Sequence, residues 1–174
     1  MSDAPAGIRL PRHLELRGRR LDLAARRAVL LLLAAVIGLA LFGVFGQRPV
    51  TARASAAAAT LTVVAPERVR GGLLTMARFR IDAHRELRRA ALVLDSGWAE
   101  SLQINTIEPA PIGEASRDGK LVLELGRVPA GRKHVLYMQF QVNPTNVGRR
   151  SQDVRLEDEG RHVVTVHRSL TVFP

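Results

Sequence analysis

The pattern of hydrophobic and polar positions changes sharply within the first third of the chain. Residues 28–45 hold no charge, proline or strongly polar side chain, whereas arginines flank this stretch on both sides. As a helix the stretch would be about 27 Å long, close to the ~30 Å hydrocarbon core of a bilayer. A continuous helix also satisfies its own backbone hydrogen bonds in lipid. The pattern therefore predicts one transmembrane helix over residues 28–45.

Beyond residue 60 the hydrophobic period becomes two. The alternation is clearest in residues 75–83, 120–126 and 133–142, where apolar side chains occupy every second position. Such alternation is typical of antiparallel strands that have one face on a core. We expect Phe79, Leu123 and Phe140 to face that core together, because each lies on the apolar side of its strand.

The spacing of these runs indicates the architecture. Turn signals such as Asp118-Gly119 and Asn143-Pro144 separate them. About seven strands within ~115 residues, without a helix of useful length, are typical of a β-sandwich. The fold class that we expect is all-β: an antiparallel β-sandwich of about seven strands, preceded by one N-terminal transmembrane helix.

Residues 118–142, DGKLVLELGRVPAGRKHVLYMQFQV, place a short Pro-Ala-Gly turn between a strand and a long alternating strand. This segment resembles the immunoglobulin-like repeats of bacterial surface proteins, and residues 77–97 are similar to their preceding strand pair. The resemblance implies an immunoglobulin-like sandwich that acts as a spacer or interaction module. It supplies no catalytic residue.

The flanking charges orient the expected helix. Seven arginines precede residue 28, whereas only Arg48 and Arg53 follow shortly after the apolar stretch. The arginine-rich side of such a helix stays in the cytoplasm, so the N-terminus is expected inside. The expected organisation is a cytoplasmic tail (1–27), the transmembrane helix (28–45), a linker (46–60) and an extracytoplasmic domain (61–174).

A cleaved signal peptide is the alternative to a retained anchor. The segment ARASAAAA (52–59) offers small-residue cleavage sites, which would give a secreted form cut near Ala56. Against cleavage, the apolar stretch is longer than the ~7–15 residues usual in a signal peptide. The stretch also ends well before the cleavage site. We therefore expect a single-pass protein of the cell membrane.

The composition of the chain limits the classes of partner that we expect. The net charge of +10 would be divided across the membrane, and the chain has few aromatic side chains, so nucleic-acid binding is not expected. Arginine greatly outnumbers lysine, which together with abundant Ala, Val and Gly suggests a bacterial genome of high GC content. The absence of cysteine excludes disulfides and thiol chemistry. The expected partners are the lipid bilayer and an envelope protein of unknown identity.

The sequence contains no pattern typical of catalysis, a cofactor site or a metal site. His162 and His167 are five residues apart on one expected strand and so point to opposite faces. Residues 157–159 form an acidic cluster that we interpret as a hairpin tip rather than a calcium loop. Trp98, the only tryptophan, is expected to cap the core, with an exposed binding role as the alternative.

The candidate contact surface is basic. It comprises Arg78 and Arg80 on the outer face of one strand, with Arg88 and Arg89 expected close by. Such a surface attracts anionic partners. The sequence thus predicts a non-enzymatic bacterial envelope protein that presents an interaction or accessory domain. The alternative is a protein that binds an envelope polysaccharide or anionic polymer.

Overall fold

The computed structural model describes residues 15–41, 48–100, 102–145 and 147–173. The chain divides into two units, residues 1–44 and 45–174. The first unit contains helix α1 (Glu15–Leu41), which begins well before the expected start at Ala28. Within α1, Leu23–Leu41 is long and apolar enough to cross a membrane, with a mean hydropathy of 2.1. Residues 42–45 of the expected span lie outside the described residues.

The second unit is built almost entirely of strands. Within the described residues they are β1 Pro49–Ser55, β2 Ala59–Pro66, β3 Arg68–Arg70, β4 Leu74–Ala83, β5 Leu87–Leu94, β6 Leu102–Glu108, β7 Gly113–Arg117, β8 Lys120–Val128, β9 Lys133–Val142, β10 Gly148–Ser151, β11 Val154–Asp158, β12 Arg161–Val166 and β13 Ser169–Phe173. One short 3-10 helix, η1 (Ser96–Trp98), joins β5 to β6.

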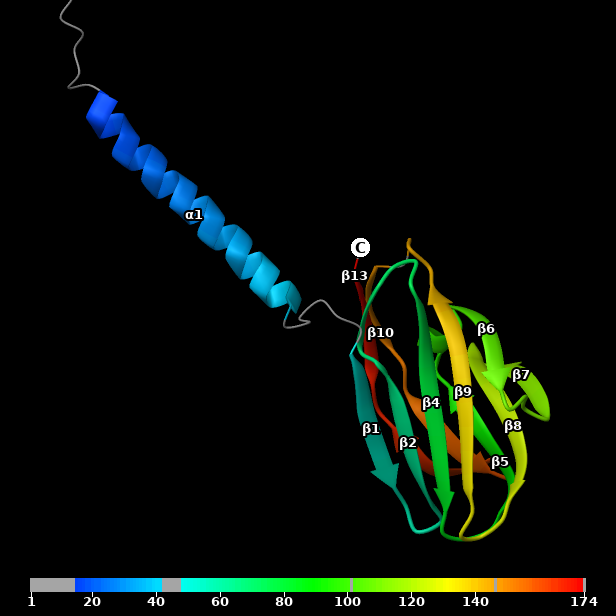
Figure 1. Ribbon diagram of the computed structural model, residues 1–174. Coiled ribbons are helices and arrows are strands. Elements are labelled where there is room, and N and C mark those ends of the chain that lie inside the picture. The colour runs from blue at the N-terminus through cyan, green and yellow to red at the C-terminus, as the bar shows by residue number, and fades with distance from the viewer. Residues whose placement is uncertain (1–14, 42–47, 101, 146, 174) are drawn as a thin grey trace, which may run out of the picture. The chain divides into compact units, whose positions relative to one another are not determined.

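Two five-stranded antiparallel sheets form the sandwich (Figure 1). Sheet A has the order β1-β2-β4-β9-β6, and sheet C has the order β12-β11-β5-β8-β7. A third, three-stranded sheet B has the order β10-β13-β3, in which β13 and β3 are parallel. The predicted all-β sandwich, preceded in the sequence by one N-terminal helix, is confirmed, with more strands than the seven expected. Short strands such as β3, β7 and β10 were missed because their alternation extends over too few residues.

The segment expected to be a linker is largely strand. Strand β1 pairs with β2 from Pro49 opposite Pro66 to Ser55 opposite Thr60. The inward side chains of β1 are alanines, and Ala52 and Ala54 pack against the core. Alanine carries little hydrophobic signal, so the alternation of this strand was hidden in a run that resembled a flexible connection. Of the linker predicted for 46–60, residue 48 and the turn between β1 and β2 lie outside the strands, and residues 46–47 lie outside the described residues.

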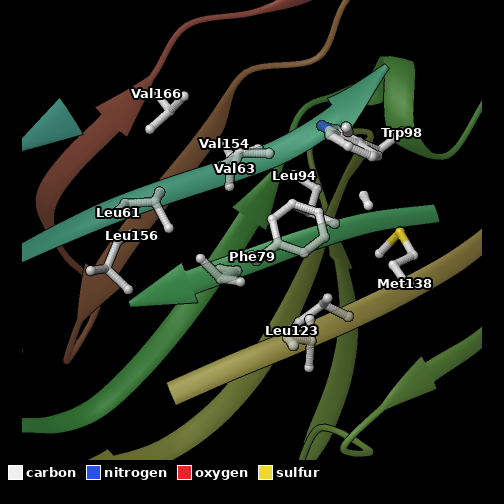
Figure 2. Packing of buried hydrophobic residues seen from close by; sticks show 14 of the residues in the cluster. Leu61, Val63, Phe79, Leu94, Trp98, Leu123, Met138, Val154, Leu156 and Val166 are labelled. Atoms are coloured by element: carbon white, nitrogen blue, oxygen red, sulfur yellow. The ribbon is translucent and has the colours of Figure 1, made fainter. Parts of the chain in front are cut away.

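The core lies between sheets A and C and is confirmed at the three expected positions. Phe79, Leu123 and Phe140 are all buried. Trp98 lies inside the sandwich rather than on its surface, with its ring centroid 5.3 Å from that of Phe79 and 5.8 Å from that of Phe140. Figure 2 shows Trp98 and Phe79 among the aliphatic side chains of both sheets. Trp98 Nε1 donates a 3.0 Å hydrogen bond to the carbonyl oxygen of Gln152, which fixes the ring.

A buried arginine closes one side of this core. Arg168 Nη2 donates hydrogen bonds of 3.2 and 2.8 Å to the carbonyl oxygens of Ala65 and Pro66. Its Cζ lies 5.1 Å from the centroid of the Trp98 ring, within the range of a cation–π contact. Burial lowers the pKa of Arg168 to about 10. These contacts tie the segment before β13 to the end of β2.

Candidate functional site

The outer face of sheet A carries the first two predicted site residues. Arg78 and Arg80 lie on the same face of β4, as their alternate positions require. Arg80 is held by Asp82 of the same strand, whose Oδ2 accepts hydrogen bonds of 3.0 Å from Nε and 2.9 Å from Nη2. Arg78 is exposed and lies opposite Tyr137 of β9 and Val64 of β2. The positive charge of Arg78 is therefore the more available of the two.

The other two predicted residues lie on a different sheet. Arg88 and Arg89 belong to β5 in sheet C, although β5 directly follows β4 in sequence. The register of β5 against β8 shifts between Leu87 and Ala90, and this bulge leaves both arginines exposed. The structure thus brings together Arg78 and Arg80 but separates them from Arg88 and Arg89. The expected single surface is two surfaces, because the chain changes sheets between β4 and β5.

The outer face of sheet C is hollowed. A cavity of about 320 Å³ lies over its central strands, with Ala91 and Val122 among its apolar lining and Arg89, Arg117, Glu124, Glu157 and Glu159 among its charged lining. A smaller hollow of about 120 Å³ on the same face is lined by Val93 and by charged residues that include Lys120 and Arg155. Both hollows are lined by side chains of both charges.

A buried carboxylate lines the larger hollow. The register of β11 against β12 shifts between Leu156 and Glu157, and the Glu157 side chain is only 8% exposed. Its Oε2 lies 3.5 Å from Arg117 Nη1, and its Oε1 lies 3.6 Å from Arg155 Nη1. Glu157 therefore serves to hold two arginines, whereas it was expected at an acidic hairpin tip.

That hairpin itself is confirmed. Asp158 pairs with Arg161, and the two residues between them have positive φ angles of 51° at Glu159 and 75° at Gly160. Two consecutive positive φ angles are typical of the tight turn that joins antiparallel strands. The cluster of acidic residues is thus explained by a turn and by the ion pairs of Glu157 with two partly exposed arginines.

The outer face of sheet C has a signature in the sequence, a run of five apolar residues in β5. Residues 90–94 read AALVL, and Val93 and Val122 are both buried although they lie on the outer face of sheet C. A strand that is apolar at every position is typical of a strand covered on both faces. Here Val122 and Val93 line the two hollows together with charged side chains of neighbouring strands.

The histidines His162 and His167 have different hydrogen-bond partners and do not form a common site. His162 Nε2 lies 2.9 Å from Thr165 Oγ1, and His167 Nδ1 lies 2.7 Å from Asp153 Oδ2. Burial lowers the pKa of His134. Within the part of the chain that the structure describes, no three His, Asp or Glu side chains are grouped closely enough to hold a metal ion.

The chain has distant likenesses to solved structures. No protein-family model and no curated protein sequence matches this chain. Among solved structures, a non-cellulosomal cohesin from the hyperthermophilic archaeon Archaeoglobus fulgidus is 13% identical, with a TM-score of 0.40 over 73% of this chain and 92% of the cohesin. The solution structure of CaCohA2 from Clostridium acetobutylicum is also 13% identical, with a TM-score of 0.42 over 60% of this chain and 86% of the other.

This chain also matches a small part of a third, much larger solved structure. It is a GH20 exo-β-N-acetylglucosaminidase from Vibrio harveyi, 9% identical, with a TM-score of 0.30 over 73% of this chain and 18% of the enzyme. At these identities and scores the likenesses assign no residue role to this chain. The fold and its two outer faces define the class of the domain: an all-β sandwich that follows an apolar helix.

Proposed function

We propose that this chain is a bacterial cell-envelope protein that α1 anchors in the membrane and whose sandwich acts outside it as a non-enzymatic interaction domain. The observation that carries the proposal is the apolar composition of α1. The span Leu23–Leu41 is 19 residues long with a mean hydropathy of 2.1, and its residues 28–41 include no charged side chain. A helix that is apolar on every side needs an apolar environment, which a bilayer supplies.

The structure of β1 supports a retained anchor. A cut after Ala56 would remove the whole of β1, which pairs with β2 over its full length. It would also remove Ala52 and Ala54 from their packing against the core. The small residues that resembled a cleavage site are therefore accounted for as the inward side of an edge strand and its turn.

Single-cysteine labelling tests the topology, because the chain has no cysteine of its own. In intact cells a membrane-impermeant maleimide should label Ser55→Cys, whose position is exposed on β1, and should spare Ser2→Cys. Permeabilised cells provide the control, in which both variants should react. Labelling of Ser2→Cys alone in intact cells would show that the topology is the reverse of the one proposed. A mature form that begins beyond residue 48 would refute the retained anchor.

The contact surface for a partner is proposed on sheet A around Arg78. The outer faces of sheets A and C allow a matched comparison, since each carries a pair of exposed or half-exposed arginines. Arg78→Glu/Arg80→Glu should lower binding of the protein to isolated envelope fractions, whereas Arg88→Glu/Arg89→Glu should not. Charge-driven binding should also weaken as salt shortens the ~8–10 Å screening length.

The comparison distinguishes the two faces. If only the sheet C variant loses binding, the contact surface belongs to the hollow face. If binding is independent of salt and of both pairs of substitutions, contact through these arginines is refuted. Crosslinking of the anchored protein in native membranes, followed by mass spectrometry, then identifies whether the bound component is a protein or an anionic polymer. Circular dichroism of each variant controls for folding.

A further inference from the structure

Exposed apolar side chains gather at one end of the sandwich. Of the large apolar side chains that are well exposed in the described residues of this domain, only Ile112 and Tyr137 lie elsewhere. The others are Val50, Leu73, Leu74, Met76, Val147 and Phe173, with exposures from 39% to 55%. We call this group the tether end, because β1 begins there at Pro49, next to residues 42–48 that follow α1.

The strand registers and loop hydrogen bonds bring these residues together. Leu74, at the start of β4, lies opposite Gln141 at the end of β9. The Val142 amide donates to the Leu73 carbonyl oxygen at 3.2 Å, and the Gly71 amide donates to the Phe173 carbonyl oxygen at 3.0 Å. In Figure 1 the start of β4 and the end of β13 both lie at the upper end of the sandwich.

The tether end is also basic. Arg48, Arg68, Arg70 and Arg149 are exposed around it. Within the described part of the chain, none of these four arginines forms an ion pair. Exposed aliphatic and aromatic side chains beside arginines are the combination that binds the interface of an anionic bilayer, with apolar groups at the headgroup–acyl boundary and cations on lipid phosphates.

The length of the connection makes the bilayer the nearest surface. Seven residues separate Leu41 from Pro49. Fully extended, they reach at most about 25 Å. We infer that the tether end rests on the anionic headgroup surface of the bilayer that α1 spans. This inference builds on the proposed anchoring and adds that the sandwich is held at the membrane by a second contact.

A fluorescent reporter on the full chain in proteoliposomes tests the contact. Leu74→Cys, labelled with an environment-sensitive fluorophore, places the reporter in the tether end. Ala130→Cys places it in the exposed turn between β8 and β9, at the opposite end of sheet A, and serves as the matched control. Vesicles contain phosphatidylcholine with or without phosphatidylglycerol, and a fraction of the lipids carries a quencher near the headgroup.

The expected result is a blue shift and loss of fluorescence at position 74 in anionic vesicles, with neither at position 130. Both effects should decrease in vesicles of phosphatidylcholine alone and after Arg68→Glu/Arg70→Glu. If those arginine substitutions leave the quenching unchanged, the electrostatic part of the contact is wrong. A reporter at 74 that stays in water overturns the inference.

Two further outcomes separate this inference from the anchoring on which it rests. A blue shift at position 74 without quenching by lipid would place the tether end against protein, such as a second copy of the chain, and would also overturn the inference. Flotation of the vesicles is measured first. A chain that does not float with them refutes the proposed anchoring, whereas a chain that floats with a water-exposed reporter refutes only the second contact.

Discussion

Truncation of Phe140 to alanine tests the register of β9 in sheet A. Phe140 is 1% exposed, and its ring meets Trp98 edge to face at an interplanar angle of 84°. Replacing a buried phenylalanine by alanine costs about 3–5 kcal/mol of unfolding free energy. The lost aromatic pair contributes about 0.5–1.5 kcal/mol beyond its buried area. We expect the change in unfolding free energy to lie within the first of these ranges.

The neighbouring residue provides the matched control. The side chain of Gln139 lies on the outer face of the same strand, where its Oε1 accepts a 3.3 Å hydrogen bond from Thr106 Oγ1 at the surface. Gln139→Ala should therefore change the unfolding free energy by no more than about 0.5 kcal/mol. The contrast between two adjacent positions depends only on which face of β9 each side chain occupies.

Urea unfolding of the full chain in detergent measures both variants. Trp98 is the only tryptophan and is fully buried, so its fluorescence reports the sandwich without a contribution from α1. Far-UV circular dichroism provides a second probe, because Phe140→Ala also alters the surroundings of Trp98. Similar losses of stability in the two variants would refute the register of β9, even if both proteins fold.

Other predictions concern backbone packing, pH and the N-terminus of the mature chain. Gly97→Ala should destabilise the sandwich by about 1–3 kcal/mol or more, because the new Cβ would lie 2.0 Å from the carbonyl oxygen of Ser151; Ser96→Ala, measured by the same urea titration, should have a much smaller effect. Burial lowers the pKa of His134 below its ordinary 6.5, so the unfolded chain takes up a proton first and the unfolding free energy should fall as the pH drops below that value. His134→Leu should remove this part of the pH dependence, and an unchanged slope would assign it to other groups. A chain that is cut after Ala56 should lose β1 and unfold at lower urea than the full chain, and equal midpoints would show that β1 contributes nothing.

Much of the fold was predictable because strand and helix patterns are local. A long run of apolar side chains needs an apolar environment at any position in a protein, which is why α1 was recognised. Alternation of period two determines which side chains of one strand share a face. The burial of Leu136, Met138 and Phe140 on β9 therefore followed from the sequence.

The candidate surfaces were predictable only in part. Arg78 and Arg80 were correctly placed on one face, since they are two residues apart on one strand. Their separation from Arg88 and Arg89 was not predictable, because the sheet that a strand joins is decided by hydrogen bonds to strands far away in sequence. The tether end is a stronger example, because it combines residues near positions 50, 74, 147 and 173. Local periodicity assigns a side chain to a face of its strand, whereas only the long-range pairing and packing of the strands decide which faces and ends of the domain are formed together.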